Sequence, residues 1–178
     1  MNTNKQRLAS SQRLALRLLN TDDLDAVTAI YRDNRRFFHL IADINEPPAE
    51  YIWADMQEGP PGYDGHKHFF GLFLRESGEM IGVADIVVNY PTAGKGIFGL
   101  LLLSEKHQSG GLGTEAVGLV EGWARESDAT SEVTVGVEWV NERARRFWRK
   151  CGYHPTGESF ETTALGRTHQ AEVLLKRL

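Results

Sequence analysis

The segment that most constrains the fold runs from Leu100 to Ala116, where an apolar stretch passes through a polar connector into a glycine-rich turn. The apolar run before the connector predicts a buried strand, and the apolar spacing after the glycines predicts a helix. Gly111 and Gly113 permit backbone conformations that other residues avoid, so successive N–H groups can converge on one anion. The groups expected to converge belong to Gln108, Ser109, Gly110, Gly111, Leu112, Gly113 and Thr114.

The helix that starts at this turn adds partial positive charge at its N-terminus. No Lys-Ser or Lys-Thr pair follows the glycines. The turn is therefore not the loop of P-loop NTPases, whose lysine and hydroxyl group contact the terminal phosphate and its magnesium ion. It predicts a site for a diphosphate that is held without a metal ion.

Two motifs in the second half of the chain resemble those of the GNAT N-acetyltransferase superfamily. The spacing Gln108-x-x-Gly111-x-Gly113 is similar to the family motif Gln/Arg-x-x-Gly-x-Gly/Ala, which binds the pyrophosphate of acetyl-CoA. The family stretch Asn-x-x-Ala-x-x-Leu/Phe-Tyr-x-Lys-x-Gly-Phe is similar to residues 141–153, NERARRFWRKCGY. By motif the resemblance covers residues 80–178, and the first half agrees only in the order of its elements. It implies an acyltransferase that uses acetyl-CoA as its acyl donor.

A second interpretation of the same turn is the fingerprint of a dinucleotide-binding oxidoreductase. Gly111-x-Gly113-x-x-Ala116 fits its loose form, and Glu138 ends the next predicted strand, where a ribose-binding acid would stand. However, seven residues, 104–110, separate the strand from Gly111, whereas the fingerprint has its glycines directly after the strand. Only about 40 residues follow Glu138, too few for the remaining βαβ units of a doubly wound fold.

Length and composition predict one globular domain, residues 1–178, because 41% of the residues are hydrophobic and 25% are charged. The single Cys151 excludes an internal disulfide. No apolar run has membrane-spanning length and no secretion signal is apparent, so we expect a cytoplasmic enzyme. The net charge of −4 favours cationic amines over nucleic acid. No metal site is expected from the singly placed histidines, His66, His68, His107 and His169.

Apolar patterns along the chain predict an α/β (α+β) arrangement without repeats. Strands are expected at residues 14–19, 68–75, 80–88, 96–103, 133–138, 153–161 and 168–175. Helices are expected at residues 21–34 with Thr21 as N-cap, at 48–56, after the glycine turn, and over the arginine-rich residues 143–150. The resemblance implies a mixed, largely antiparallel, seven-stranded GNAT-type sheet with helices on both faces. In that fold a parallel pair of strands splays apart and opens a slot for the cofactor.

The resemblance also implies which residues contact the cofactor. The backbone of Leu101, Leu102 and Leu103 would pair with the pantetheine arm as an added strand does, with free N–H groups around Leu102 and Leu103 that polarise the thioester carbonyl. Asn141 matches a motif residue whose amide contacts the cofactor, and helix N-capping is an alternative role that can hold at the same time.

Trp148 stands where family members commonly have the tyrosine that protonates the CoA thiolate. An indole N–H donates hydrogen bonds but is no acid near neutral pH. We therefore expect Trp148 to pack against CoA, while water or Tyr153 supplies the proton. Cys151 has no obvious histidine partner and is expected to pack rather than to attack.

The arginine-rich helix has two interpretations. Its charges can form a solvated face opposite an apolar stripe, or one or two of them can lie near a phosphate of CoA. The charged residues are Arg143, Arg145, Arg146, Arg149 and Lys150.

Acetyl transfer to an amine needs a base, because an alkylamine of pKa about 10.4 is protonated at neutral pH. The strand before the glycine turn has no carboxylate, unlike family members that place a glutamate there. Asp85 and Glu138 are therefore the candidate catalytic residues. Asp85 interrupts an apolar strand, where a charge is costly unless it is exposed or used, and Glu138 ends the strand beside the slot. For each, a solvated or salt-bridged acid is the alternative.

These observations predict an N-acetyltransferase that moves an acetyl group from acetyl-CoA to a primary amine by direct attack in a ternary complex. The expected partner is a small-molecule amine or a protein N-terminal amine, without nucleic acid or membrane, and a homodimer stays open. The acceptor is not readable, because residues 35–66 and the last hairpin carry no motif. A non-catalytic acyl-CoA-binding sensor is the alternative, since the family's tyrosine and strand glutamate are both missing.

Overall fold

The computed structural model describes residues 7–63, 65 and 67–178, and the predicted histidine His66 lies outside these ranges. Its strands are β1 (Arg7–Ser10), β2 (Leu14–Leu18), β3 (Lys67–Leu74), β4 (Met80–Val88), β5 (Lys95–Leu103), β6 (Glu132–Glu138), β7 (His154–Ala164) and β8 (Arg167–Arg177). Its helices are α1 (Leu24–Arg32), α2 (Arg35–Ala42), α3 (Ala49–Gln57), α4 (Leu112–Asp128) and α5 (Glu142–Lys150), with short 3₁₀ turns η1 (Thr21–Asp23) and η2 (Glu105–His107).

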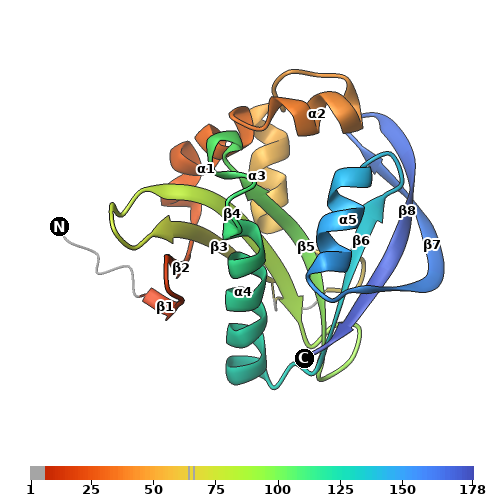
Figure 1. Cartoon of the computed structure of the whole chain (residues 1–178). Helices are drawn as coiled ribbons and strands as arrows, with labels where there is room; N and C mark the ends of the chain where they lie inside the picture. Colours follow the sequence, from red (N-terminus) through yellow and green to blue (C-terminus); the bar gives the residue numbers. More distant parts are fainter. Residues whose placement is uncertain (1–6, 64, 66) are drawn as a thin grey trace.

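The strands form one mixed sheet in the order β1-β2-β3-β4-β5-β6-β8-β7 (Figure 1). Every neighbouring pair is antiparallel except β5 and β6. The predicted fold class is therefore confirmed. Because β5 and β6 are the single parallel pair among the described residues, the doubly wound sheet required by the dinucleotide alternative is not formed.

The described chain contributes eight strands to the sheet, whereas seven were expected. The additional strand is β1, a segment of four residues at the edge of the sheet that pairs with β2. So short a segment carries no readable alternation of apolar and polar residues, and its pairing with β2 is what makes it a strand.

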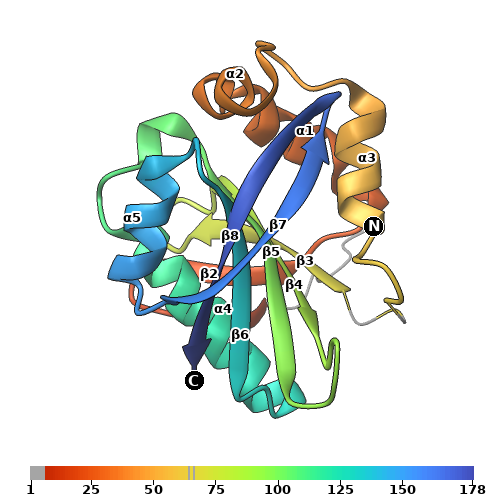
Figure 2. The same ribbon diagram turned by 90° about the vertical axis from the view of Figure 1, so that its right-hand side faces the viewer.

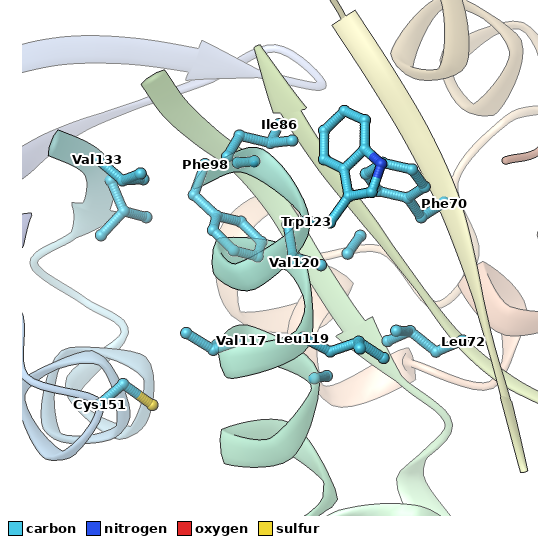
Figure 3. Close-up of a cluster of buried hydrophobic side chains, with 14 of the residues drawn as sticks. Phe70, Leu72, Ile86, Phe98, Val117, Leu119, Val120, Trp123, Val133 and Cys151 are labelled. Atoms are coloured by element: carbon cyan, nitrogen blue, oxygen red, sulfur yellow. The ribbon is translucent and has the colours of Figure 1, made fainter. Parts of the chain in front are cut away.

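Helices cover both faces of the sheet, as expected. On one face, α4 lies along the strands, and Val117, Val120 and Trp123 of this helix pack over Phe70 and Phe98 (Figure 3). The apolar spacing that predicts this helix is thus the stripe that it buries. Among the described residues no helix is both long enough and apolar enough to cross a membrane.

The opposite face is covered by α1, α2 and α3, where two helices were expected. The expected N-cap at Thr21 is wrong, because Asn20 holds that role: its side chain accepts a hydrogen bond from Asp22 N at 2.9 Å, and its own N–H donates to Asp23 Oδ2 at 3.1 Å. The chain then turns at Asn34 between α1 and α2. Phe38 and Ile41 of α2 enter the core on this face, which shows why the segment folds as a separate helix.

Candidate functional site

The candidate site begins where the two parallel strands separate. Residues 95–98 of β5 pair with residues 132–135 of β6, and beyond this point β5 stays paired with β4 while β6 stays paired with β8. Figure 1 shows the two strands diverging toward α2. The rotated view in Figure 2 shows α2 lying across the end of the sheet toward which β5 and β6 diverge. The predicted splayed pair is therefore present.

A β-bulge marks the point of separation. Asp85 of β4 lies opposite Leu100 and Ile86 lies opposite Phe98, so Gly99 is an extra residue in β5. The carboxylate of Asp85 accepts the backbone N–H of Gly99, and a side chain on Gly99 would collide with that carboxylate. Asp85 therefore supports the backbone at the start of the opening between β5 and β6.

Next to this opening, a cavity of about 420 Å³ lies between the end of β5, the glycine turn, α2 and α5. Its lining comes from three stretches of the sequence, residues 34–40, 101–114 and 141–150. Leucine and phenylalanine side chains form much of its wall, and basic side chains come from both α2 and α5. The lining residues are Asn34, Arg36, Phe37, Leu40, Leu101, Leu102, Leu103, Glu105, Gln108, Ser109, Gly111, Gly113, Thr114, Asn141, Arg143, Ala144, Phe147 and Lys150.

At the end of β5, every second residue points its backbone N–H and C=O groups away from β4 and toward the cavity. The Leu103 carbonyl accepts a hydrogen bond from Gln108 Nε2 at 2.8 Å, away from β4. The Leu102 carbonyl points to β4, where a side chain on Gly82 would approach it to 2.5 Å. Because backbone groups alternate between the two edges of a strand, Leu101 and Leu103 present their N–H and C=O groups outward. The outward N–H groups thus lie at Leu101 and Leu103 rather than at Leu102.

The glycine turn leaves a run of backbone donors unused. Gly111 is the N-cap of α4 with φ of +79°, a conformation that favours glycine, and no side chain caps the helix. No hydrogen-bond acceptor in the described chain is paired with the N–H groups of residues 109–114. The backbone N–H of Gln108 was expected to join these donors, but it donates to the Glu105 carbonyl at 3.3 Å instead. The remaining donors at a helix N-terminus form a site suited to an anion.

Gln108 acts through its side chain instead. Its Nε2 atom donates to the Leu103 carbonyl and, at 3.1 Å, to Asn34 Oδ1. Asn34 is buried and donates from Nδ2 to the Ile30 carbonyl at 2.8 Å. These bonds tie the end of α1 to the connector before the glycine turn, so α2 is held beside the cavity.

Helix α5 forms the opposite wall. Asn141 Oδ1 accepts the Ala144 N–H at 3.1 Å, so the N-capping role of Asn141 is present while the residue also lines the cavity. Arg145 binds Glu172 at 2.6 Å, and Arg149 binds the same carboxylate at 3.2 Å. Arg143 and Lys150 line the cavity instead. Part of the positive charge of the helix is therefore paired with Glu172, and part of it faces the cavity.

Trp148 was expected to pack against CoA, but its side chain lies in the core behind the cavity wall. It is 6% exposed and does not line the cavity, because the adjacent Phe147 occupies that position on the helix. Its ring contacts those of Phe98 at 5.0 Å, Phe147 at 5.3 Å and Tyr153 at 5.0 Å between centroids. Trp148 is thus part of the core that supports the cavity wall.

Tyr153 does not line the cavity either. Its side chain is buried, and its hydroxyl donates to Glu121 Oε1 at 2.8 Å. Burial and the negative charge of Glu121 raise the pKa of Tyr153 far above its usual range. A phenol with a raised pKa is a poorer acid, so Tyr153 does not fit the role of proton donor.

Asp85 and Glu138 lie on the face opposite α4 and α5, beside the cavity rather than in its wall. Asp85 is 3% exposed and pairs with the Lys67 ammonium at 3.2 Å. Burial raises the pKa of Asp85 to about 7, although the positive charge of Lys67 opposes the shift. Glu138 ends β6 and is partly buried, and its carboxylate forms no hydrogen bond or ion pair within the described ranges. Both acids therefore differ from an ordinary surface carboxylate.

Most of the predicted cofactor residues meet in the cavity wall, and Gly110, Leu112 and Trp148 do not. The sequence interpretation missed the contribution of α2, whose Arg36, Phe37 and Leu40 line the cavity. An Asp-Asn pair at residues 33–34, ahead of a second amphipathic segment, is the signal that could have indicated this helix.

Comparisons with protein families and with solved structures both point to acetyltransferases. The family model for an acetyltransferase (GNAT) domain matches residues 13–154. No curated protein sequence matches this chain significantly. Among solved structures, an acetyltransferase from Thermus thermophilus has 24% identity and a TM-score of 0.71, covering 97% of this chain and 100% of that chain.

Two further structures have named activities. Spermidine N-acetyltransferase from Vibrio cholerae, in complex with CoA and spermine, has 16% identity and a TM-score of 0.70, covering 94% of this chain and 96% of that one. The ribosomal L7/L12 alpha-N-protein acetyltransferase RimL has 16% identity and a TM-score of 0.75, and the match covers 97% of this chain and 94% of that chain. At these identities the likeness concerns the fold.

Proposed function

Because the chain belongs to the GNAT acetyltransferase family, whose acyl donor is acetyl-CoA, we propose that it transfers the acetyl group directly to a primary amine in a ternary complex in the cytoplasm. The observation that carries the proposal is the cavity between the end of β5 and α5, which has a glycine turn with unused N–H donors in its wall and lies beyond the point where β5 and β6 separate. No covalent enzyme intermediate is required, and Cys151 is buried behind the cavity wall.

The residues of the cavity fit acetyl-CoA part by part. The free N–H groups of residues 109–114 suit the diphosphate, and the outward backbone groups of Leu101 and Leu103 suit the amides of pantetheine. Arg36, Arg143 and Lys150 supply positive charge for the remaining phosphate. When bound, acetyl-CoA supplies the activated thioester. The N–H of Leu101 or Leu103 would stabilise negative charge that develops on its carbonyl oxygen.

We assign the base role to Asp85, with Glu138 as the alternative. Asp85 lies at the bulge where the strands separate, and its pKa of about 7 suits a base that works near neutral pH. Glu138 lies at the other side of the separation without an ion-pair partner in the described chain. For the departing thiolate, water is the proposed proton source, because Trp148 and Tyr153 are both buried in the core.

The surroundings of these acids favour a cationic acceptor. Burial together with the negative charges of Asp55 and Glu138 raises the pKa of Tyr51, which places both acids near this ring. Asp55 also accepts a hydrogen bond from Tyr31 at 2.5 Å. Named structural neighbours act on spermidine and on a protein N-terminus, and both are amines. The acceptor class we propose is therefore an amine that is protonated in solution.

The direct test is a panel of amines assayed for release of the CoA thiol from acetyl-CoA. Polyamines, amino sugars and peptides with free N-termini would each be offered to the purified protein. Release that depends on one class of amine supports the proposal. Tight binding of acetyl-CoA without release for any amine would instead favour the acyl-CoA sensor.

Replacing Gly111 by valine is expected to weaken CoA binding by at least about tenfold, because a β-branched residue is strained at the φ of +79° that the turn requires. The N–H groups at the start of α4 would then no longer converge. Calorimetric titration with CoA measures the effect. Gly118→Val is the matched control, since Gly118 lies on the same helix with open space around it. Equal CoA affinity in folded Gly111→Val protein would refute the diphosphate assignment.

A further inference from the structure

Arg13, in the turn between β1 and β2, contacts the glycine turn although it does not line the cavity. Its guanidinium donates from Nη1 to the Gly110 carbonyl at 2.9 Å and from Nε to Glu115 Oε2 at 2.6 Å. Its backbone N–H donates to Glu115 Oε1 at 2.7 Å. One planar side chain therefore links the carbonyl of the turn to the first turn of α4.

Glu115 holds this arginine in place. Its carboxylate also accepts a hydrogen bond from Ser11 Oγ at 2.6 Å, so three donors of the β1–β2 turn converge on it. Burial opposes ionisation, but the hydrogen bonds from Ser11 and Arg13 outweigh it and lower the pKa of Glu115. Because the ionised carboxylate neutralises the guanidinium, Arg13 is poorly suited to act as a phosphate ligand itself.

The bond to Gly110 sets the direction of the next N–H group. A trans peptide is planar, and its C=O and N–H point to opposite sides. With the Gly110 carbonyl held by Arg13, the N–H of Gly111 points the other way. This agrees with the cavity lining, which includes Gly111 but not Gly110.

Such an anchor matters because this peptide joins two glycines. Nothing lies within 4 Å of where a side chain on Gly110 would be, and Gly111 has a positive φ. Neither residue has a Cβ to restrict rotation of the peptide between them. A rotated peptide would direct its carbonyl oxygen, a partial negative charge, at the diphosphate.

We propose that Arg13 is a positioning residue for the diphosphate of CoA, which holds the Gly110–Gly111 peptide with its N–H toward the cavity. Glu115 fixes the guanidinium for this purpose. The inference deepens the proposed function and rests on it, because it takes the glycine turn as the diphosphate site.

The test compares CoA with pantetheine, which lacks the diphosphate together with the 3′-phosphoadenosine of CoA. Pantetheine has the thiol arm of CoA but no phosphate, so a change confined to the glycine turn affects CoA alone. Arg13→Ala is expected to weaken CoA binding by about tenfold, the effect of one lost charge-assisted hydrogen bond, and to leave pantetheine binding unchanged. Calorimetric titration measures both affinities. A general loss of structure would weaken both ligands equally, and that outcome overturns the proposal.

Arg75→Ala is the matched control. Arg75 donates to the Ser11 and Gln12 carbonyls at 2.8 and 3.3 Å, so it binds the same β1–β2 turn without touching the glycines. CoA affinity should be unchanged in this variant. A loss equal to that of Arg13→Ala would show that any damage to the β1–β2 turn weakens CoA, which overturns a specific role for Arg13.

Arg13→Lys separates positioning from charge and serves if the alanine variant does not fold. Lysine keeps the positive charge but lacks the planar fork that reaches Glu115 and the Gly110 carbonyl together. CoA binding should therefore fall nearly as far as in Arg13→Ala. Full retention of CoA affinity would mean that charge alone suffices, and the positioning role would be refuted. If the parent protein binds no CoA, the proposed function itself fails; if parent and Arg13→Lys bind it equally, only this inference fails.

Discussion

Asp85→Asn should lower the rate of acetyl transfer at pH 7 by about 100-fold or more, the contribution typical of a general base, while CoA affinity changes little. The asparagine is nearly isosteric and can still accept the Gly99 N–H, so the bulge should persist. It has no carboxylate to accept the proton of the amine. Steady-state rates together with titration of CoA separate the two effects.

The pH dependence of the acetyl-transfer rate should differ between the parent and Asp85→Asn. The pKa of Asp85 is about 7, so the carboxyl is protonated below this pH and unable to accept a proton. The parent should therefore gain activity as the pH rises through 7, and the variant should lack this rise. At high pH the deficit should shrink, because the amine itself loses its proton near pH 10.4, roughly its usual pKa.

Glu138→Gln is the matched comparison, since it removes the other candidate carboxylate near the opening. A parent-like rate in this variant, with a deficit in Asp85→Asn, assigns the base. Identical, pH-independent rates in parent and Asp85→Asn would remove Asp85 from the mechanism and transfer the role to Glu138 or to water.

Asp85 should also make stability depend on pH. Its pKa is raised from 3.8 to about 7 on folding, so between these values the folded chain binds more protons than the unfolded chain. The free energy of unfolding must then fall as the pH rises through this window, by up to about 1.4 kcal/mol per pH unit. Denaturant unfolding from pH 4 to 7 should show this slope in the parent and a shallower one in Asp85→Asn, where the raised pKa of Asp55 still contributes. Equal slopes would mean that Asp85 ionises normally in the folded protein.

The sequence was most informative where local chemistry decides the structure. Gly111 has the positive φ that its position in the motif predicts, and Asn141 caps the helix that follows it. The apolar spacing along α4 predicts both the helix and its buried face. These features depend on a few neighbouring residues, so the chain order alone reveals them.

Features that depend on distant partners could not be predicted in the same way. Strand β1 exists because it pairs with β2, and α2 lies beside the cavity because Asn34 is tied to Gln108, far along the chain. The link between Arg13 and Gly110 likewise joins segments that no motif connects. Burial decides the outcome for Asp85, whose ion pair with Lys67 and bond to Gly99 require the assembled sheet.

Trp148 illustrates a motif position whose role changes with the residue. The motif resemblance predicts a proton-donating tyrosine at this position, and in the structure Trp148 packs against Phe98, Phe147 and Tyr153. No hydrogen bond to its indole N–H is formed by the described residues, so the ring contributes area rather than polar contacts. Because Phe147 lines the cavity, Trp148 affects the site through the residue it supports.

Trp148→Ala should therefore lower the free energy of unfolding by about 3–5 kcal/mol, the usual cost of removing a large aromatic side chain from a core. CoA affinity should fall as well, because Phe147 loses its support. Trp148→Phe keeps an aromatic ring and leaves no broken hydrogen bond, so stability should fall by only about 1–2 kcal/mol and turnover should change little. Denaturant unfolding, CoA titration and turnover measure the three effects.

Trp123→Ala is the control that separates loss of core packing from an effect on the site. Trp123 is buried on α4 against His68 and Phe70, and it does not line the cavity. Its removal should cost similar stability and leave the CoA affinity of the folded protein unchanged. If Trp148→Ala weakens CoA binding and Trp123→Ala does not, support of Phe147 is the cause. A collapse of turnover in Trp148→Phe, with stability and CoA affinity intact, would instead show that the indole N–H takes part in the chemistry, and the packing role would have to be abandoned.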